Sequence, residues 1–461
     1  MDDFSLFSDW KLCSSCGLPP SDHGDTNKSE QNTKLLSCSR CHSAAYPNVR
    51  CQRAHWNSGH KHQCKKLQNA IKPLLELMKW HHRCNEGMED SEYTSWITTD
   101  MIGDFLIDKN RALWQRGVEE WDNTQYSSAM DMFQRYLSPY QNAWYTFPNK
   151  RPFFVQQLSD TDKNRFCESA LRLAKRLLFC AYCELDGDQI DSARQRLAQS
   201  LSLLITIQSL PACPKREVKT NMDDAWMELT LSMEEIPSDR VIARHVAKMA
   251  INTKSCEWVN PLQRPGYMAK VPLDGISFIP REQHHLGSGQ RGSGHDDHRV
   301  VIGRSWTEYV LFGTGAFSES DNDAPVTKQL IRKYVPDAIS LARMGGGEVI
   351  FSRLAGGTHI QAHCGPTNIR WTAHLGLVVP GSTKDCRIRV AEEWHSWEAG
   401  RLLLFDDSYE HEVVNNTNEE RVVLLMRLWH PQIDSSTRNE VLMGALSMKE
   451  ESVNKRYYPP K

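Results

Sequence analysis

The stretch Glu348-Val349-Ile350-Phe351-Ser352-Arg353-Leu354 opens the part of the sequence that decides the fold of the C-terminal third of the chain. It is the first of several short runs rich in Val, Ile and Leu, and clusters of Gly, Pro, Asp and Asn separate one run from the next. The other runs cover residues 369–379, 386–391, 401–405 and 421–428. Short apolar runs between turn residues are typical of antiparallel strands, so this region predicts a sandwich or a barrel.

Two histidines stand at the edges of these runs. His363 and His411 are 48 residues apart, and two imidazoles at strand ends of a barrel are what a mononuclear iron site requires. The usual oxygenase site adds a carboxylate two residues after the first histidine, but that position is Gly365 here. Spacing alone therefore indicates only part of a metal-binding triad, and a structural role for each histidine stays open.

Longer motifs surround both histidines: H-x3-H-x-G-P-T-N at 359–368, H-L-G-L at 374–377, E-x-G-x4-F-D-D-S-x-E-H-E-V at 398–413 and R-x7-W-H-P at 421–431. On these motifs, residues 349–431 resemble the aspartyl/asparaginyl β-hydroxylase family of Fe(II)- and 2-oxoglutarate-dependent dioxygenases, and a weaker similarity extends back to Trp306. That family also has Gly at the position of residue 365. The resemblance implies a double-stranded β-helix (a cupin-like jelly roll) over residues 301–435.

The resemblance also implies a role for each matching residue. His363 and His411 would bind Fe(II) and form the catalytic centre. Arg421 would bind the distal carboxylate of 2-oxoglutarate, a task suited to a planar bidentate donor, and Ser352 would donate to the same carboxylate. His374 would approach the other end of the cosubstrate.

One position departs from the family pattern and puts the cosubstrate site in question. The family carries Arg two residues before His374, and here that residue is Thr372. Arg370 stands two residues earlier, and in a strand these three side chains face the same side. Arg370 could therefore compensate as a cosubstrate ligand, or it could only keep its structural place.

A Cys- and His-rich segment near the N-terminus indicates a second metal site. Its candidate ligands follow zinc spacing, with two residues between paired thiols: Cys13, Cys16, Cys38, Cys41, Cys51, His60 and Cys64. A segment so poor in large aliphatic residues cannot bury much apolar surface and needs metal to fold. The pattern predicts two zinc ions bound by interleaved ligands.

Residues 13–64 resemble a MYND-type zinc finger, and the resemblance implies a pairing of the ligands. One zinc would take Cys38, Cys41, His60 and Cys64. Cys13, Cys16 and Cys51 would leave the other zinc with three ligands, because Pro47 stands where the family has a further Cys. Water, His23 or His42 could fill that position. MYND fingers usually bind short peptides, so a peptide partner is expected.

The region between these modules follows helical periodicity. Apolar residues recur at helical spacing in three sets: Leu67, Ile71, Leu75 and Met78; Tyr126, Ala129, Phe133 and Leu137; Ile190, Ala193, Leu197 and Leu201. The last two sets repeat one pattern 64 residues apart, which resembles the second helix of a helical-repeat hairpin but suits plain bundle packing equally well. We expect a multidomain α+β protein with a finger at 11–66, a helical scaffold at 67–250, a linker at 251–300, the barrel at 301–435 and a tail at 436–461.

Composition narrows the class of protein and its partners. The chain has 461 residues, with 40% hydrophobic and 24% charged residues, which is ordinary for a globular protein. A net charge of −2 gives no general attraction to nucleic acid or membranes, and no apolar run approaches bilayer length. The start Met1–Trp10 is acidic and does not resemble a secretory signal, so we expect a cytoplasmic or nuclear protein with reduced thiols.

Several other residues attract attention, and for most of them a structural role is favoured. Residues 287–292 spell G-x-G-x-x-G without the flanking strand and helix of a nucleotide site, and nearby histidines suit a solvated loop. His359 is expected to be structural, and Asp406 and Asp407 to orient His411. Residues 180–183 spell C-x2-C inside an apolar helical pattern, which favours packing. Cys364 follows a metal ligand, so its oxidation is conceivable.

Three functions remain under comparison. The first is a dioxygenase that hydroxylates a C–H bond, with an Asp/Asn-type side chain of an intracellular protein or peptide as substrate and the finger as recruiter. The second is an inactive barrel that serves as an adaptor or sensor, which Thr372 suggests. The third is halogenation, because a missing carboxylate opens a position for halide. The sequence leaves the substrate and the oligomeric state open.

Overall fold

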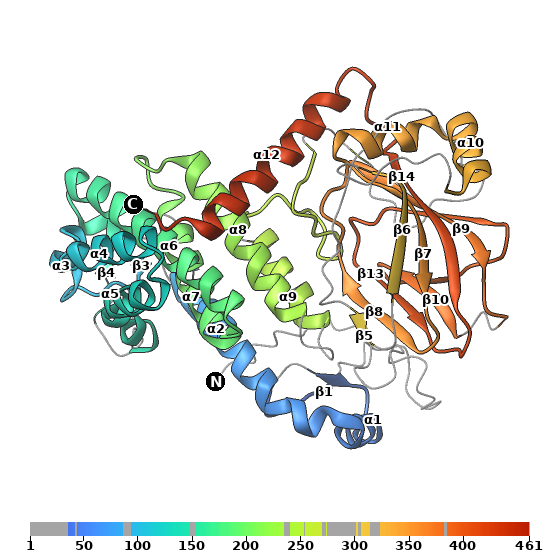
Figure 1. The fold of residues 1–461 in the computed structure, drawn as a ribbon. Helices are drawn as coiled ribbons and strands as arrows, with labels where there is room; N and C mark the ends of the chain where they lie inside the picture. Colours follow the sequence, from blue (N-terminus) through green and yellow to red (C-terminus); the bar gives the residue numbers. More distant parts are fainter. Residues whose placement is uncertain are drawn as a thin grey trace. The chain divides into compact units, whose positions relative to one another are not determined.

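The computed structural model describes residues 36–41, 44–85, 94–146, 151, 153–234, 240–252, 254–269, 273, 301–302, 306–313, 323–381 and 385–460. It contains two compact units: Met1–Glu257 with Ser452–Lys461, and Trp258–Glu451 (Figure 1). The first unit is helical apart from two pairs of very short strands, and the second is built on antiparallel sheets. The expected multidomain α+β class is confirmed.

The first unit begins with the finger. Strand β1 (Leu36–Ser37) pairs antiparallel with β2 (Ala45–Tyr46), and helix α1 (Val49–His55), a π-helical turn (Trp56–His60) and helix α2 (Lys61–Asn85) follow. Asn48 caps α1, because its Oδ1 accepts a hydrogen bond from the Cys51 amide at 2.9 Å. The π-helical turn contains Gly59 at φ 145°, a conformation that other residues rarely adopt.

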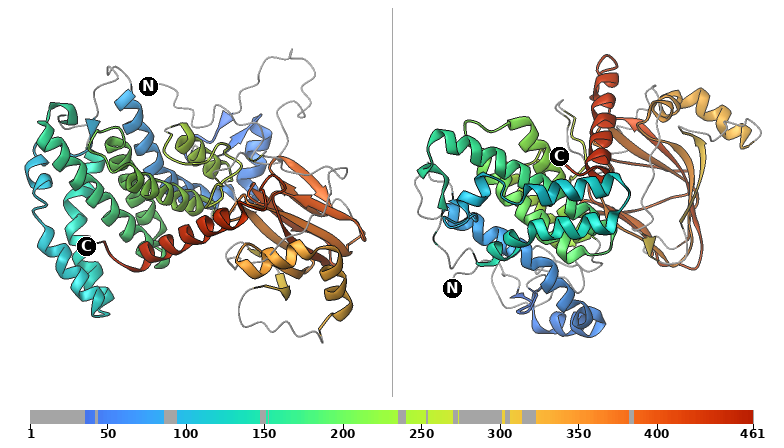
Figure 2. Two further views of the ribbon diagram at one scale, coloured as in Figure 1. Left: turned by 90° about the horizontal axis from the view of Figure 1, so that it is seen from above. Right: turned by 60° about the vertical axis from the view of Figure 1, so that its left-hand side comes forward.

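The rest of the first unit is a series of helices: α3 (Ile102–Leu106), α4 (Arg111–Asp122), α5 (Tyr126–Thr146), α6 (Asp160–Asp186), α7 (Ile190–Ile207), α8 (Lys215–Glu234) and α9 (Arg240–Asn252). Strands β3 (Thr94–Ser95) and β4 (Phe153–Phe154) pair beside them, and a 3-10 turn covers Val155–Gln157. Consecutive helices pack as hairpins, α4 with α5 and α6 with α7, and α8 continues the series against α7 (Figure 2). The helical character that the repeated spacing predicts is thus present, and the choice between a repeat and a plain bundle stays open.

The predicted helix faces are buried, with small shifts. In α5, Ala129, Phe133 and Leu137 are buried while Tyr126 is exposed, and in α7 the corresponding Ala193, Leu197 and Leu201 are buried. A Cβ at Gly117 would lie 2.6 Å from the Phe133 ring, so α4 and α5 approach closely only because residue 117 is Gly. In α2 the buried face runs through Leu74 and Leu77, and Leu75 and Met78 are half-buried.

The second unit contains two five-stranded antiparallel sheets. One has the order β12-β9-β14-β7-β6 and the other β11-β10-β13-β8-β5. Their bounds are β5 Val301–Ile302, β6 Trp306–Phe312, β7 Val349–Leu354, β8 Thr358–His363, β9 Arg370–Val378, β10 Cys386–Val390, β11 Glu393–Ser396, β12 Leu402–Phe405, β13 His411–Asn415 and β14 Arg421–Trp429. One cluster of buried apolar side chains, from Ile350 to Leu425, combines residues of both sheets, so the sheets face each other across it.

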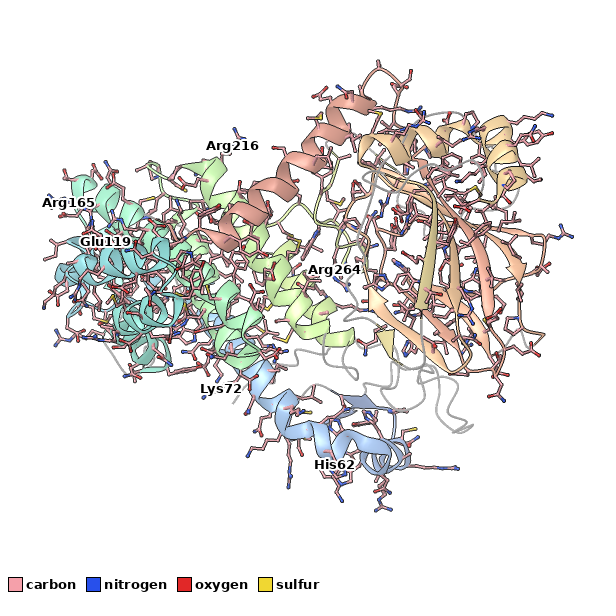
Figure 3. All side chains as sticks on the ribbon, in the orientation of Figure 1. His62, Lys72, Glu119, Arg165, Arg216 and Arg264 are labelled. Carbon is pink, nitrogen blue, oxygen red and sulfur yellow. The ribbon has the colours of Figure 1, made fainter. Side chains whose placement is uncertain are left out.

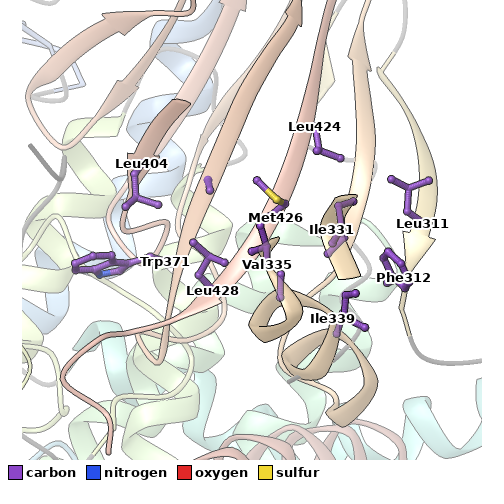
Figure 4. Close-up of a cluster of buried hydrophobic side chains, with 14 residues drawn as sticks. Leu311, Phe312, Ile331, Val335, Ile339, Trp371, Leu404, Leu424, Met426 and Leu428 are labelled. Atoms are coloured by element: carbon purple, nitrogen blue, oxygen red, sulfur yellow. The ribbon is translucent and has the colours of Figure 1, made fainter. Parts of the chain in front are cut away.

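Side chains alternate between the two faces of the first sheet. On β14, Leu424, Met426 and Leu428 belong to an outer cluster, which α10 (Pro325–Tyr334) and α11 (Pro336–Met344) cover (Figure 4). Val423 and Leu425 face the opposite sheet. The side chains of two other odd-numbered residues of β14, Arg421 and Arg427, point to the same side and therefore enter the interior of the barrel.

Helix α12 (Arg438–Tyr457) follows the barrel and leads into the last residues of the chain. Residues 452–461 belong to the first unit, where the indole N–H groups of Trp114 and Trp121 donate to the carbonyls of Pro460 and Tyr457. In the described part of the chain, no helix is both long and apolar enough to cross a bilayer.

Part of the expected linker is an ordered strap on the barrel, residues 258–269, which we call the 258–269 strap. Its Tyr267 amide donates to Pro366 O at 3.0 Å, and its Leu262 carbonyl accepts from the Glu410 amide at 2.6 Å. The glycine-rich sequence at 287–292 and the histidines around it lie outside the described residues.

Candidate functional site

The structure brings His363 and His411 together at one end of the barrel. His363 ends β8 and His411 begins β13, and the two residues are direct partners in the pairing of these strands. Their ring centroids are 4.3 Å apart. The pairing becomes irregular immediately after His411, and a bulge of this kind is a common way to aim a side chain at a site.

Hydrogen bonds fix the same tautomer in both rings. His363 Nδ1 lies 2.8 Å from Gln361 O, and His411 Nδ1 lies 2.8 Å from Tyr409 O. A carbonyl oxygen only accepts, so each Nδ1 carries the proton and each Nε2 keeps a lone pair. Metal-binding histidines are commonly held in this way.

The surroundings keep His411 uncharged. Burial, and next the proximity of His363, lower the pKa of His411 to about 3. A neutral imidazole is the form that binds a metal ion. Among the described residues, no third Cys, His, Asp or Glu completes a close ligand group with this pair.

The Asp407 carboxylate lies beside Gly365, in the space that a side chain at position 365 would need. A Cβ at Gly365 would lie 2.7 Å from Asp407 Oδ2, and the Gly365 amide donates to Asp407 O at 2.7 Å. Burial would raise the pKa of Asp407, but the guanidinium groups of Arg427 and Arg370 outweigh it and hold the pKa at about 2. An ionised carboxylate thus lies beside the loop that carries His363.

Arg421 is a fully buried cation in the interior of the barrel. Its side chain is 1% exposed, Nη2 lies 3.4 Å from Ser352 Oγ, and the guanidinium lies 4.7 Å from the Trp397 ring. Among the described residues no carboxylate forms an ion pair with it, and its Nε has no hydrogen-bond partner. Burial lowers its pKa to about 10, so it stays charged at neutral pH.

His374 presents a second unsatisfied donor near Arg421. The Trp397 indole N–H donates to His374 Nδ1 at 3.3 Å, so a neutral ring carries its proton on Nε2. That Nε2 is buried and has no partner. Burial, together with the charges of Arg421 and Arg427, lowers the pKa of His374 well below its usual value. Two buried donors without acceptors fit a bound carboxylate ligand.

Arg370, which the sequence offered as a possible replacement for the missing cation at Thr372, makes two hydrogen bonds within the protein. Its Nη1 donates to Gly346 O at 2.8 Å and its Nη2 to Asp407 Oδ2 at 3.3 Å. Both terminal nitrogens are therefore engaged with the protein, and the role of Arg370 as a cosubstrate ligand stays a prediction without support from these contacts. Ser352 lies next to Arg421, and its Oγ accepts from Arg421 Nη2 and from the Trp306 indole at 3.0 Å.

The opposite face of β13 carries a buried ionic network. Glu410 and Glu412, one residue on either side of His411, are fully buried and pair with Arg389. Arg264 of the 258–269 strap, labelled in Figure 3, pairs with Glu410 at 2.9 Å. His359 pairs with Glu412 at 3.0 Å, which agrees with its expected structural role. The network fixes the strand that presents His411.

The finger brings four of its predicted ligands together. The ligand atoms of Cys38, Cys41, His60 and Cys64 all lie within 4.8 Å of one another, and all four residues are buried. Cys38 Sγ lies 3.9 Å from Cys64 Sγ, close to the roughly 3.8 Å edge of a zinc tetrahedron with Zn–S of about 2.3 Å. Cys41 and His60 lower the pKa of Cys38 to about 3, although burial opposes them. This group fits zinc.

The second predicted zinc site stays a prediction, because most of its candidate ligands lie outside the described residues. Cys51 lies on α1 and is half-buried, outside the group of four. Cys13, Cys16, His23 and His42 lie outside the described residues. Cys180 is buried and Cys183 half-buried in α6, and burial raises the pKa of both thiols, which suits packing.

Sequence reasoning missed several residues of the barrel site. Trp397, which touches both His374 and Arg421, gave no signal beyond its aromatic type. Arg427 was not singled out, although it lies an even number of residues after Arg421 on one strand and would therefore face the same interior. Neither the position of Asp407 against Gly365 nor the 258–269 strap could be read from spacing.

Two family models match the chain. Residues 276–431 match "Aspartyl/Asparaginyl beta-hydroxylase", and residues 13–64 match "MYND finger". Both resemblances inferred from the motifs are thereby confirmed for these segments.

Curated relatives share part of the chain. It is 36% identical over 137 residues to the Homo sapiens protein "Aspartyl/asparaginyl beta-hydroxylase", covering 30% of this chain and 17% of that protein. It is 37% identical over 127 residues to "Ornithine lipid ester-linked acyl 2-hydroxylase" of Rhizobium tropici, covering 27% and 42%. It is 42% identical over 95 residues to Homo sapiens "Aspartate beta-hydroxylase domain-containing protein 2", covering 20% and 25%. The chain thus spans less than half the length of each of these relatives.

Proposed function

We propose that the C-terminal barrel is an Fe(II)- and 2-oxoglutarate-dependent dioxygenase that hydroxylates a C–H bond. The observation that carries this proposal is the pair His363 and His411, whose rings are 4.3 Å apart and whose Nδ1–H groups both bind backbone carbonyls. With each Nδ1–H held by a carbonyl, the two Nε2 atoms are the ones available to Fe(II), and two protein ligands leave several positions open.

The buried donors supply the second part of the proposal. Arg421 and Ser352 would bind one carboxylate of 2-oxoglutarate, and His374 Nε2–H would bind toward the other end. A buried cation without an anionic partner is costly, so its presence is best explained by an anionic ligand. When bound, iron and 2-oxoglutarate would supply the oxygen chemistry, and these buried side chains would orient the cosubstrate.

The substrate is proposed from the relatives and the modules. Relatives are named for aspartyl/asparaginyl and for lipid hydroxylation, which places C–H hydroxylation above other reactions. The finger and the helical hairpins are protein-binding types of module, so we favour an Asp/Asn-type side chain of an intracellular protein or peptide. The finger would then bring a peptide-containing partner to the barrel.

Thr372 favours a second candidate, a barrel without activity that serves as an adaptor or sensor. The absence of Arg at this position removes a cation that the resembling family carries. The intact set of His363, His411 and Arg421 argues against this candidate, because an adaptor gains nothing from a buried guanidinium that forms no ion pair with any described carboxylate.

Ligand binding and turnover separate the two candidates. Wild-type protein with Mn(II) in place of iron should bind 2-oxoglutarate in calorimetry, and with Fe(II) it should release succinate. His363→Ala should lose both, whereas His395→Ala, on the exposed edge strand β11, should keep both. Wild-type protein that binds metal and 2-oxoglutarate but never releases succinate, with or without candidate peptides, would support the adaptor. A wild-type protein that binds no 2-oxoglutarate would exclude the dioxygenase.

A further inference from the structure

Arg427 is a buried cation that enters the barrel from β14 and ends among polar groups of three other chain segments. Its Nε donates to Glu348 Oε1 at 3.1 Å, and its Nη1 donates to Asp407 Oδ2 at 2.5 Å and to Thr372 Oγ1. Thr372 is its direct cross-strand partner on β9. One guanidinium therefore joins β9 to the turn between β12 and β13.

The backbone around this arginine leaves room for it. A Cβ at Gly347 would lie 2.3 Å from Arg427 Cβ and 2.6 Å from its Cγ, so residue 347 can carry no side chain while the arginine stem lies there. The neighbouring Gly346 carbonyl accepts from Arg370 Nη1 at 2.8 Å. The glycine run thus accommodates two guanidinium groups that converge on one acidic residue.

That acidic residue is Asp407, and both guanidinium groups bind the same oxygen of its carboxylate. Its Oδ2 accepts from both Arg370 and Arg427, whereas its Oδ1 is buried and has no partner. Arg370 and Arg427 together balance the charges of Asp407 and Glu348. This balance explains how an ionised carboxylate can be buried against Gly365, in the place where a metal-binding carboxylate would otherwise begin.

We propose that Arg427 is a positioning residue of the metal site, which holds the Asp407 carboxylate against Gly365 from across the strand pair. Thr372 and Arg427 form a hydrogen-bonded cross-strand pair, with the cation on β14 and the small hydroxyl residue on β9. The residue that departs from the family pattern is thereby matched by a cation on the adjacent strand. This inference rests on the proposed function, because the property that Arg427 changes is the affinity of the barrel for its metal ion.

The test measures metal affinity rather than activity. Co(II) binding is followed by calorimetry, and the thermal transition of each variant shows whether it is folded. Arg427→Met should bind Co(II) roughly 10- to 100-fold more weakly than wild type, the usual effect of removing a residue that orients a metal site. The double variant Thr372→Arg with Arg427→Thr moves the cation to the other strand and should recover most of that loss.

Two control variants separate positioning from folding. Arg353→Met removes an arginine of β7 that is half exposed and pairs with Glu420, and it should leave Co(II) affinity unchanged. Ile388→Ala opens a cavity in the buried cluster between the sheets and should lower the unfolding temperature without changing the affinity of the folded protein.

Each result decides for or against the inference. Folded Arg427→Met that binds Co(II) within twofold of wild type overturns it. If that variant does not fold, the double variant Thr372→Arg with Arg427→Thr decides, because it keeps the charge balance. Co(II) affinity near that of wild type supports the inference, and weak Co(II) binding by the folded double variant overturns it. Wild-type protein that binds no Co(II) overturns the proposed function, and this inference with it, before any variant is compared.

Discussion

Replacing Arg421 with Met should abolish 2-oxoglutarate binding without destabilising the ligand-free barrel. Burial lowers the pKa of this fully buried guanidinium from 12.5 to about 10, which corresponds to an unfavourable term of about 3 kcal/mol for the charged form. At pH 7, below both pKa values, this whole term opposes folding. Arg421→Met removes it and loses the contact with the Trp397 ring and a hydrogen bond to Ser352, together about 2 kcal/mol.

The expected net effect on the ligand-free protein is therefore between no change and a gain of about 1 kcal/mol, or roughly 2–4 °C in the barrel transition. Arg427→Met, on the same face of the same strand, removes a cation with two carboxylate partners and should instead cost about 3–5 kcal/mol. The assay is a thermal unfolding scan with and without Mn(II) and 2-oxoglutarate. Ligand at about 100 times its Kd should stabilise wild type by about 2.7 kcal/mol and leave Arg421→Met unchanged.

The reasoning fails if Arg421→Met melts as early as Arg427→Met without ligand, since Arg421 would then be a structural cation with a partner. It also fails if 2-oxoglutarate still raises the transition temperature of Arg421→Met.

Three further predictions follow from the same geometry. Gly365→Ala should weaken Co(II) binding by about tenfold, because its Cβ would displace Asp407; Gly381→Ala, where a Cβ meets nothing within 4 Å, is the control. Stability of the metal-free barrel should fall as the pH drops from about 6.5 toward 3, because His411 takes up a proton in the unfolded chain before it does so in the folded one, and a His411→Gln variant should show a shallower fall in denaturant titrations. Elemental analysis should find at least one zinc per chain, and Cys64→Ser should lose it together with the protease resistance of the finger, since zinc contributes on the order of 10 kcal/mol to such folds.

The residues of the two candidate metal sites could be predicted because short-range sequence patterns encode them. Thiols two residues apart belong to one zinc site, and this rule located Cys38 and Cys41, which the structure brings to His60 and Cys64. In the barrel, the pair of histidines was identified from strand ends and long motifs. The family pattern also placed Arg421 beside Ser352, which the structure shows at 3.4 Å.

The remaining contacts depend on strand order, which local sequence does not specify. Arg427 meets Thr372 only because β14 lies between β7 and β9 in this register. Arg370 lies on the same strand as His374, two positions before Thr372, and the Gly346 carbonyl and the Asp407 carboxylate accept hydrogen bonds from its guanidinium. The hydrogen-bond partners of these arginines depend on which groups neighbouring strands and loops bring near them. The spacing of residues along one strand does not predict those neighbours.

The 258–269 strap changes where the barrel can be cut. Gln263 donates to Ser408 Oγ at 2.8 Å, and Arg264 pairs with Glu410, one residue before the candidate metal ligand His411. A fragment that starts after residue 270 would leave the Glu410 carboxylate one cation short in a dry interior. Recombinant versions of the barrel should accordingly begin ahead of Trp258. Weak metal binding by shorter fragments would then result from the loss of Arg264 and would say nothing about the intact barrel.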